Sequence, residues 1–414
     1  MWSRFAIALL PALLGAFEEP EVIPRIRGRL KAALEKLPDY TCLETVERSR
    51  RPAPGAAWQP LDTIRLQVGV IDRKEMYSWS GEQRFDGREL RELTGKGIAG
   101  NGSFAEHVRH IFLGQGVEFT ARTGETIGGR EVLVFDFDLD AAFSRYTLRI
   151  PPHEAPVGVR GSFAVDRETL DIRRLEVQAH EIPPDFGIAR LSHRIHYAAV
   201  AIGARPVFLP ASAEISVLAA DEKEEHRNVI EFSGCKQYEA ESKLRFDEAA
   251  PLETSAAPAA PGPLPLNLRV EMELDSDIEP EKAALGDSVS ALVLKPARDG
   301  ERIAIPAGAV LHGRLVRLDK DAAPFPHYVV GIEFHTLEAA GARTPFSATM
   351  QQAGPASALL KQQKSMDPVF TKKRTARFDI LVREKQRGSG VLLWDARQPR
   401  IKRGLKMVWL TAEP

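Results

Sequence analysis

The sequence is poor in cysteine, has almost no net charge, and lacks long apolar runs beyond its first residues. It contains two cysteines in 414 residues and has a formal net charge of −1. After residue 16, no stretch approaches the roughly 18 uninterrupted apolar residues that a membrane-spanning helix requires. A charge so close to zero gives no overall attraction to nucleic acid. We therefore expect a mature protein that is soluble and has no nucleic-acid partner.

The common catalytic and metal-binding motifs are also missing. The chain contains no His-Glu-x-x-His motif, no Gly-x-Ser-x-Gly nucleophile elbow, and no glycine loop that ends in Gly-Lys-Ser/Thr. We therefore predict a non-enzymatic protein with no catalytic residues, no metal and no cofactor. A hydrolase with a metal site that these motifs do not describe is an alternative.

The first residues have the pattern of a secretory signal peptide. One positive charge, Arg4, precedes the short apolar run Phe5 to Ala16. Residues 1–17 are therefore predicted to direct export to the periplasm or the outside of the cell. Ala16 suits the last position before cleavage, but Leu14 stands where a small residue is preferred, so an uncleaved anchor is the alternative. No cysteine follows the run directly, which argues against a lipoprotein.

The two cysteines, Cys42 and Cys235, lie near the two ends of the first predicted domain. In an exported protein a pair of cysteines is more often bridged than free, so we predict a disulfide between them. The bridge would close a loop of roughly 190 residues and stabilise the fold by up to about 5 kcal/mol. Two isolated buried thiols are the alternative.

Residues 18–247 are predicted to form a half-open antiparallel β-barrel with one or two helices. Apolar residues at spacings of three and four predict an amphipathic helix over Pro24 to Leu37. A second helix is expected from Ser103 to Leu113. Alternation of apolar and polar residues predicts strands over the following segments: Tyr40 to Arg48, Ile64 to Val70, Met76 to Trp79, Glu131 to Leu139, Arg145 to Ile150, Gly161 to Val165, Leu170 to Ala179, Arg194 to Val200, Ala213 to Leu218 and Asn228 to Ser233.

A linker and a second domain follow. Residues 248–266 are rich in proline and alanine, which is typical of a semi-stiff linker that separates two domains and lets them reorient. Residues 267–414 contain short predicted strands and are expected to form a small β-barrel or sandwich, interrupted by a basic mobile loop from Gly354 to Arg374. The strands are expected at the following segments: Ser288 to Leu294, Arg302 to Ile305, Val310 to Leu318, Tyr328 to Leu337, Thr344 to Met350, Phe378 to Val382, Val391 to Leu393 and Lys406 to Leu410.

Several polar groups have spacings that metals or phosphates use, but each set is incomplete. His107 and His110 share one face of a predicted helix, yet no third ligand is indicated. His193 and His196 lie on a strand, where this spacing points them to opposite faces. The remaining sets are Asp136, Asp138 and Asp140, which fit a solvated sheet face better than a calcium site, and Gly95, Gly97, Gly100 and Gly102, which fit a flexible loop better than a phosphate cradle.

Positive charge is concentrated at the C-terminal end. From Gln351 to Pro414 there are fourteen Lys or Arg residues against five Asp or Glu, a local balance of +9. Such a segment is able to contact phosphates or lipid head groups at a membrane surface, and a solvated charged surface is the alternative. The clusters are Lys372, Lys373, Arg374 and Arg377, and then Arg400, Lys402, Arg403 and Lys406.

Two resemblances follow from these residues. The helix, the long antiparallel sheet and the hairpin from Gly161 to Leu170 resemble the half-open barrel of the periplasmic lipoprotein carrier and its stress-sensor relative, which implies a concave apolar face able to hold an acyl chain. The segments Leu285 to Ala291 and Ile305 to Leu315 are similar to the periplasmic β-barrel of secretion and conjugation proteins, which assembles into rings. The whole chain resembles uncharacterised exported bacterial proteins.

The sequence therefore predicts a periplasmic binding or scaffolding protein whose partner is a lipid, a lipoprotein, a peptide or an envelope protein. Leu66 and Val68, on the apolar face of a predicted strand, are expected to contact the ligand. A component of an envelope-spanning secretion or conjugation assembly is the alternative that the second resemblance implies.

Overall fold

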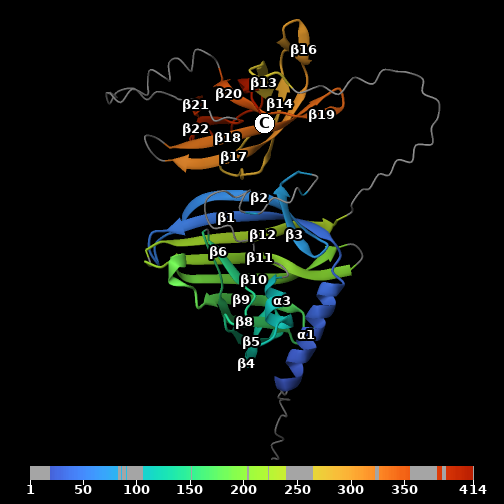
Figure 1. The fold of residues 1–414 in the computed structure, drawn as a ribbon, viewed down its shortest axis with the longest axis vertical. Helices are drawn as coiled ribbons and strands as arrows, with labels where there is room; N and C mark the ends of the chain where they lie inside the picture. Colours follow the sequence, from blue (N-terminus) through green and yellow to red (C-terminus); the bar gives the residue numbers. More distant parts are fainter. Residues whose placement is uncertain are drawn as a thin grey trace, which may run out of the picture.

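The computed structural model describes residues 19–82, 85, 90, 106–150, 152–202, 205–221, 223–238, 264–321, 326–354, 380–384 and 388–413. In these residues the chain is mostly β and forms two large antiparallel sheets, each with its own apolar core (Figure 1). The predicted signal peptide, the glycine-rich loop at 94–102, almost all of the linker and the basic loop at 355–374 lie outside the described residues.

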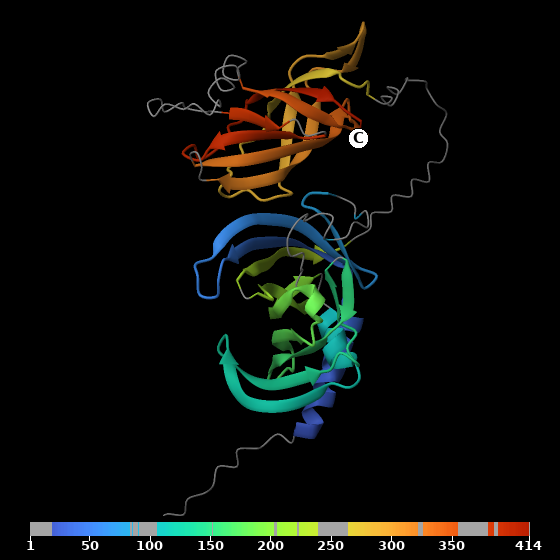
Figure 2. The ribbon, with the colours of Figure 1, turned by 60° about the vertical axis from the view of Figure 1, so that its left-hand side comes forward.

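The first sheet is a long curled sheet whose strands are all antiparallel. Its strands follow the order β3-β2-β1-β12-β11-β10-β9-β8-β5-β4, so β3 and β4 form its two edges. Figure 2 shows the bend of the sheet. This architecture confirms the predicted half-open sheet. Its strands are β1 (Tyr40–Arg51), β2 (Gln59–Ile71), β3 (Lys74–Trp79), β4 (Glu118–Ile127), β5 (Arg130–Leu139), β8 (Gly158–Asp166), β9 (Ile172–His180), β10 (Ile188–Ile202), β11 (Arg205–Ala219) and β12 (Glu225–Gln237), and β6 (Thr147–Ile150) pairs separately with β7 (His153–Pro156).

The predicted disulfide is present and joins two neighbouring strands in the interior of this sheet. Cys42 lies on β1 and Cys235 on the neighbouring strand β12, and their sulfur atoms are bonded across a sequence separation of 193 residues. The pairing register shifts between Thr41 and Leu43, beside the bridge. The bridge therefore ties the first strand of the sheet to the last strand that the chain adds to it.

Two helices pack on the core face of the first sheet. Helix α1 (Glu19–Glu35) buries Val22, Ile26 and Leu30, and helix α3 (Glu106–Leu113) buries Val108, Ile111 and Phe112 in the same core. Helix α1 begins five residues earlier than the sequence pattern predicts and contains Pro24 in its second turn, where the proline nitrogen cannot donate an intrahelical hydrogen bond.

The second sheet curls until its ends approach each other, as a small barrel requires. Met350 on β20 donates a backbone hydrogen bond of 3.3 Å to the carbonyl of Ser389, just before β22. Two of the basic residues from the C-terminal cluster, Arg400 and Arg403, are paired with Asp277 and Asp275 at 3.1 and 2.7 Å. The strands are β13 (Arg269–Leu274), β14 (Ser288–Val293), β17 (Val310–Asp321), β18 (His327–Ala339), β19 (Ala342–Pro345), β20 (Ala348–Ala353), β21 (Ile380–Glu384), β22 (Gly390–Asp395) and β23 (Lys406–Thr411), with β15 (Ala297–Asp299) and β16 (Arg302–Ile305) as a separate hairpin.

The two sheets contact each other along β2, which is the strand nearest to the second sheet in Figure 1. Leu285 exchanges two backbone hydrogen bonds of 2.8 Å with Thr63 and Arg65, where β2 extends beyond its partner β3. The guanidinium of Arg65 also contacts both carboxylate oxygens of Asp287 at 2.7 and 2.9 Å. The second sheet is thus anchored to an edge that would otherwise expose unpaired backbone groups.

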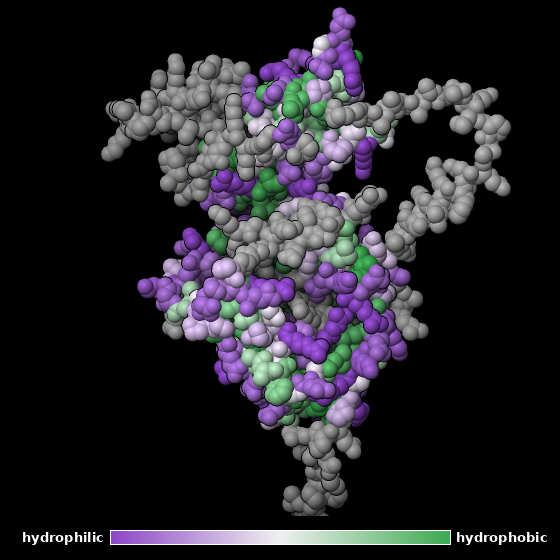
Figure 3. Space-filling model, in the orientation of Figure 1, coloured by the Kyte–Doolittle hydropathy of each residue, from purple (hydrophilic) through white to green (hydrophobic). Residues whose placement is uncertain are grey.

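On the face shown in Figure 3, hydrophilic residues cover most of the first domain, with smaller apolar areas between them. Among the described residues, no helix has the length and apolar composition needed to cross a membrane.

Candidate binding site

A largely apolar cleft lies between helix α1 and the strands β10 and β11. It has a volume of about 610 Å³, and most of the side chains that line it are apolar. The amphipathic pattern of α1 explains one wall, because the side of the helix that faces the sheet presents Leu30 and Leu34, and Leu37 follows just after the helix ends. The opposite wall and the ends are formed by aliphatic and aromatic residues: Val108, Ile172, Tyr40, Tyr197, Ile202, Pro206, Val207, Phe208, Leu209 and Pro210.

The rim of the cleft is charged. Arg29 of α1 forms an ion pair of 2.7 Å with Asp171, and both line the cleft. Lys36 lies at the same rim and is exposed. The cleft therefore combines an apolar interior with one paired and one exposed cation at its opening.

The residues predicted to contact a ligand, Leu66 and Val68, lie elsewhere on the same core face. Both are buried, at 0% and 1% exposure, and neither lines the cleft. They belong to β2, which is separated from β11 by β1 and β12. Their contact with a ligand stays a prediction.

Acidic and phenolic side chains lie on the core face of the first sheet, and two of the tyrosines among them line this cleft. Tyr40 and Tyr197 line the cleft, and the hydroxyl of Tyr77 donates a 2.8 Å hydrogen bond to Glu75. Glu44 is fully buried, and both of its carboxyl oxygens have no hydrogen-bond partner. Burial raises the pKa of Glu44 to about 8, and the Glu75 carboxylate contributes to the shift. Glu44 is therefore mostly protonated and neutral at pH 7.

These residues were not predicted from the sequence, although the strand pattern contains a signal for Glu44. In the predicted strand from Tyr40 to Arg48, Glu44 has the same parity as Tyr40, Cys42 and Val46, which all face the core. A carboxylate at a core-facing position of a strand is unusual and indicates a special role.

The structure pairs two histidines that the sequence did not connect. His107 of α3 and His193 of β10 share a hydrogen bond of 2.9 Å between their rings, and the ring of Tyr146 stacks on His107. Burial lowers the pKa of His193 to about 4 and that of His107 well below its usual range. Both rings are therefore neutral, and one donates to the other.

His193 and His196 point to opposite faces of β10, as strand alternation predicts. His193 is half-buried on the core face, where its ring meets His107, and His196 is exposed. His110 is close enough to affect the pKa of His107. In the part of the chain that the structure describes, no group of three His, Cys, Asp or Glu side chains is arranged to hold a metal ion.

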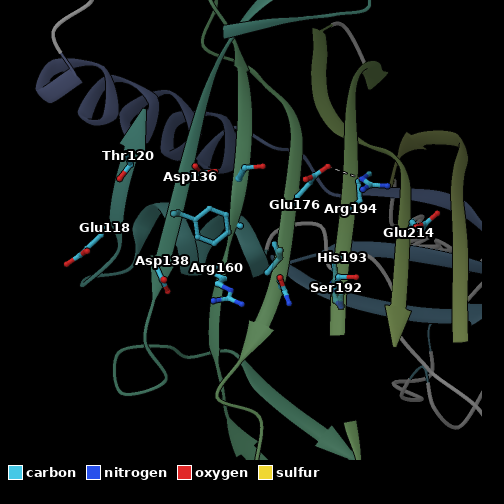
Figure 4. A pocket seen from close by; sticks show the side chains of 15 residues that line it. Glu118, Thr120, Asp136, Asp138, Arg160, Glu176, Ser192, His193, Arg194 and Glu214 are labelled. Atoms are coloured by element: carbon cyan, nitrogen blue, oxygen red, sulfur yellow. Dashed lines mark hydrogen bonds and ion pairs between the residues drawn. The ribbon is translucent and has the colours of Figure 1, made fainter. Parts of the chain in front are cut away.

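A second hollow, of about 560 Å³, crosses the opposite face of the first sheet. Figure 4 shows its charged side chains projecting from neighbouring strands. Asp136 pairs with Arg122 at 3.2 Å, Asp138 with His180 at 3.1 Å, and Glu176 with Arg194 at 2.9 Å. This agrees with the prediction that Asp136 and Asp138 belong to a solvated sheet face, because both carboxylates are about half exposed.

Comparison with solved structures shows a distant structural similarity. A DUF1329 family protein from Desulfovibrio piger is similar with a TM-score of 0.30 and 10% sequence identity, over 55% of this chain and 97% of that chain. No protein-family model matches the sequence. No curated protein matches it either. The resemblances to the lipoprotein carrier and to the secretion-system barrel therefore remain predictions.

Proposed function

We propose that this chain is a non-enzymatic binding protein of the cell envelope whose first domain holds the apolar chain of a lipid or lipoprotein in the cleft between α1 and the first sheet. The observation that carries this proposal is the cleft itself. Its volume of about 610 Å³ lies within the ~300–1,000 Å³ typical of ligand pockets. Its walls are mostly aliphatic and aromatic, which favours an apolar ligand over a sugar or a nucleotide.

The position of α1 supports the same function. The helix covers one part of a long sheet, and Leu34 and Leu37 remain only partly buried against the core. An apolar wall that is left partly open to water gains free energy when an acyl chain covers it, at roughly 25 cal/mol per Å² of apolar surface removed from water.

A larger side chain in the cleft should weaken the binding of an apolar ligand. We expect an environment-sensitive apolar dye to bind the full chain, and Leu34→Trp to weaken its binding about tenfold or more, because the larger ring occupies the space between α1 and β11. Fluorescence titration measures the affinity. The matched control is Leu61→Trp, at an exposed apolar position of β2 outside the cleft. Equal dye binding by wild type and both variants would refute the proposal.

We also propose that the chain is exported, on the basis of its N-terminal sequence. Mass spectrometry of the protein from its native host is expected to find a mature chain that begins near position 17, in an envelope or secreted fraction. Recovery of Met1 in a cytoplasmic fraction would overturn this proposal.

A further inference from the structure

The charged side chains that line the apolar cleft leave one cation without a partner. Among the described lining residues, only Arg29, Lys36 and Asp171 are charged. Asp171 is buried at 8% exposure and accepts bonds of 2.9 and 2.7 Å from the Arg29 guanidinium, so these two charges cancel. The ammonium of Lys36 has no ion pair or hydrogen bond with any residue that the structure describes. The lining of the cleft therefore carries a net positive charge, which belongs to Lys36.

The carboxylates nearest to Lys36 in the sequence have other partners. The carboxylate of Glu35 is paired with Lys31 at 4.0 Å. One oxygen of Asp39 accepts a 3.0 Å hydrogen bond from the backbone of Asp72. Neither acidic residue lines the cleft, and Lys36 follows the last residue of α1, where the partial negative charge of a helix end favours a cation. The ammonium group of Lys36 is therefore open to an anionic partner in the cleft.

A second polar side chain lies at the same end of the cleft as Lys36. Tyr40, at the start of β1, pairs with Gln237 of β12, and both residues line the cleft. The backbone of Tyr238 donates a 2.8 Å hydrogen bond to the carbonyl of Asp39, which holds the connection between α1 and β1 against the end of β12. Lys36 belongs to this connection, so its ammonium and the exposed amide of Gln237 flank one end of the cleft.

The neutral ion pair lies at the other end, and the apolar walls extend between the two ends. Helix α1 runs across the strands of the first sheet (Figure 1), and Arg29 is bonded to Asp171 just before β9. The rise of the chain from Arg29 to Lys36 is roughly 10 Å at ~1.5 Å per residue. The strand order agrees, because β10 and β11 separate β9 from β12. A molecule that fills this cleft therefore needs an apolar body and a polar group at one end.

We propose that the ligand of the cleft is a single-chain amphiphile with an anionic head group, such as a fatty acid, whose carboxylate binds Lys36 and Gln237 while its alkyl chain lies along α1. This inference rests on the proposed function, because it names the head group of the same ligand. The ammonium of Lys36 supplies the opposite charge, and the amide of Gln237 supplies a hydrogen-bond donor. A volume of about 610 Å³ is that of a pocket for one small ligand, which favours one alkyl chain over a lipid with several.

The head-group preference is tested with decanoic acid, decanol and decylamine, each displacing the apolar dye from the full chain near neutral pH. Decanoate should bind about two to five times more tightly than decanol, which is the range for an ion pair between partly exposed groups. Decylamine should bind more weakly than decanol, because Lys36 repels its cation. Lys36→Gln should remove the advantage of decanoate, and Lys36→Glu should reverse the order so that decylamine binds most tightly.

The matched controls are Lys31→Gln and Lys31→Glu, at an exposed position of the same helix outside the cleft, and both should keep the wild-type order. Circular dichroism checks that each variant is folded. Lysine acetylation followed by mass spectrometry supplies a second readout, which locates the head group. Decanoate should slow the acetylation of Lys36 in the wild type and leave that of Lys31 unchanged, whereas decanol should protect Lys36 less.

The possible outcomes separate the inference from the proposed function. Equal displacement by all three compounds, or tighter binding of decylamine by the wild type, would refute the anionic head group and leave the apolar cleft as the binding site. If Lys36→Glu keeps the wild-type order, or decanoate does not protect Lys36, the head group does not contact Lys36 and the inference is wrong. If no compound displaces the dye, or the dye does not bind, both proposals are wrong.

Discussion

Replacing Cys42 and Cys235 by serine should lower the free energy of unfolding of the first domain by about 5 kcal/mol. The bridge spans a sequence separation of 193 residues, and closing so long a loop removes much of the conformational freedom of the unfolded chain. It also joins β1 to β12, which are neighbours in the sheet but far apart in the sequence. The bridge therefore keeps these two strands linked in the unfolded chain. Urea denaturation of the variant and of the wild type measures the difference.

Reduction of the wild-type chain provides a check that does not depend on substitution. If the variant does not fold, the wild-type protein is unfolded in urea with and without a reductant. Reduction should lower the free energy of unfolding by the same amount, so the midpoint should move to a lower urea concentration. An unchanged midpoint would contradict the prediction. Thiol titration of the unfolded, unreduced protein should find no free thiol in the wild type, because the two cysteines are its only ones.

Alternation of apolar and polar residues predicted most of the strands because half-buried strands have a two-residue period. It did not predict β4, an edge strand where most residues are exposed and where the alternation of Phe119 and Ala121 with polar residues covers only the first half. It also passed over β13, although Val270, Met272 and Leu274 alternate there and are all buried. The pattern in β4 is short and weak, whereas the pattern in β13 extends over the whole strand.

The candidate site was less accessible to sequence analysis than the fold. The helix that forms one wall of the cleft was predicted, but its position over β10 and β11 depends on how the whole sheet curls. The pair His107 and His193 is separated by 86 residues, and its contact depends on the docking of α3. Local patterns predict elements and faces, and they do not determine which faces meet.

Glu44 should make the first domain lose stability as the pH rises. Its carboxyl has a pKa of about 8 in the folded chain and an ordinary value of 4.5, so between these values the unfolded chain is ionised while the folded chain still holds the proton. The stabilising contribution is complete below about pH 4.5 and is lost as the pH rises through 8. Over the whole interval the loss is about 3–5 kcal/mol, at roughly 1.4 kcal/mol per pKa unit.

The buried histidines act in the opposite direction, which fixes the interval for the measurement. The lowered pKa values of His107 and His193 mean that the unfolded chain binds more protons below pH 6.5, so their contribution to stability is lost as the pH falls. Above pH 6.5 they contribute little to the slope. The effect of Glu44 is therefore best isolated between pH 6.5 and 8.

In this interval the free energy of unfolding of the wild type should fall by about 2 kcal/mol relative to that of Glu44→Gln, because glutamine has no proton to retain. Urea denaturation at pH 6.5, 7, 7.5 and 8 follows the difference, and Glu47→Gln should keep the wild-type slope, since its side chain is exposed. Parallel curves for wild type and Glu44→Gln would mean that Glu44 ionises normally in the folded chain. Dye binding in the apolar cleft would be unaffected by that result, because Glu44 does not line the cleft.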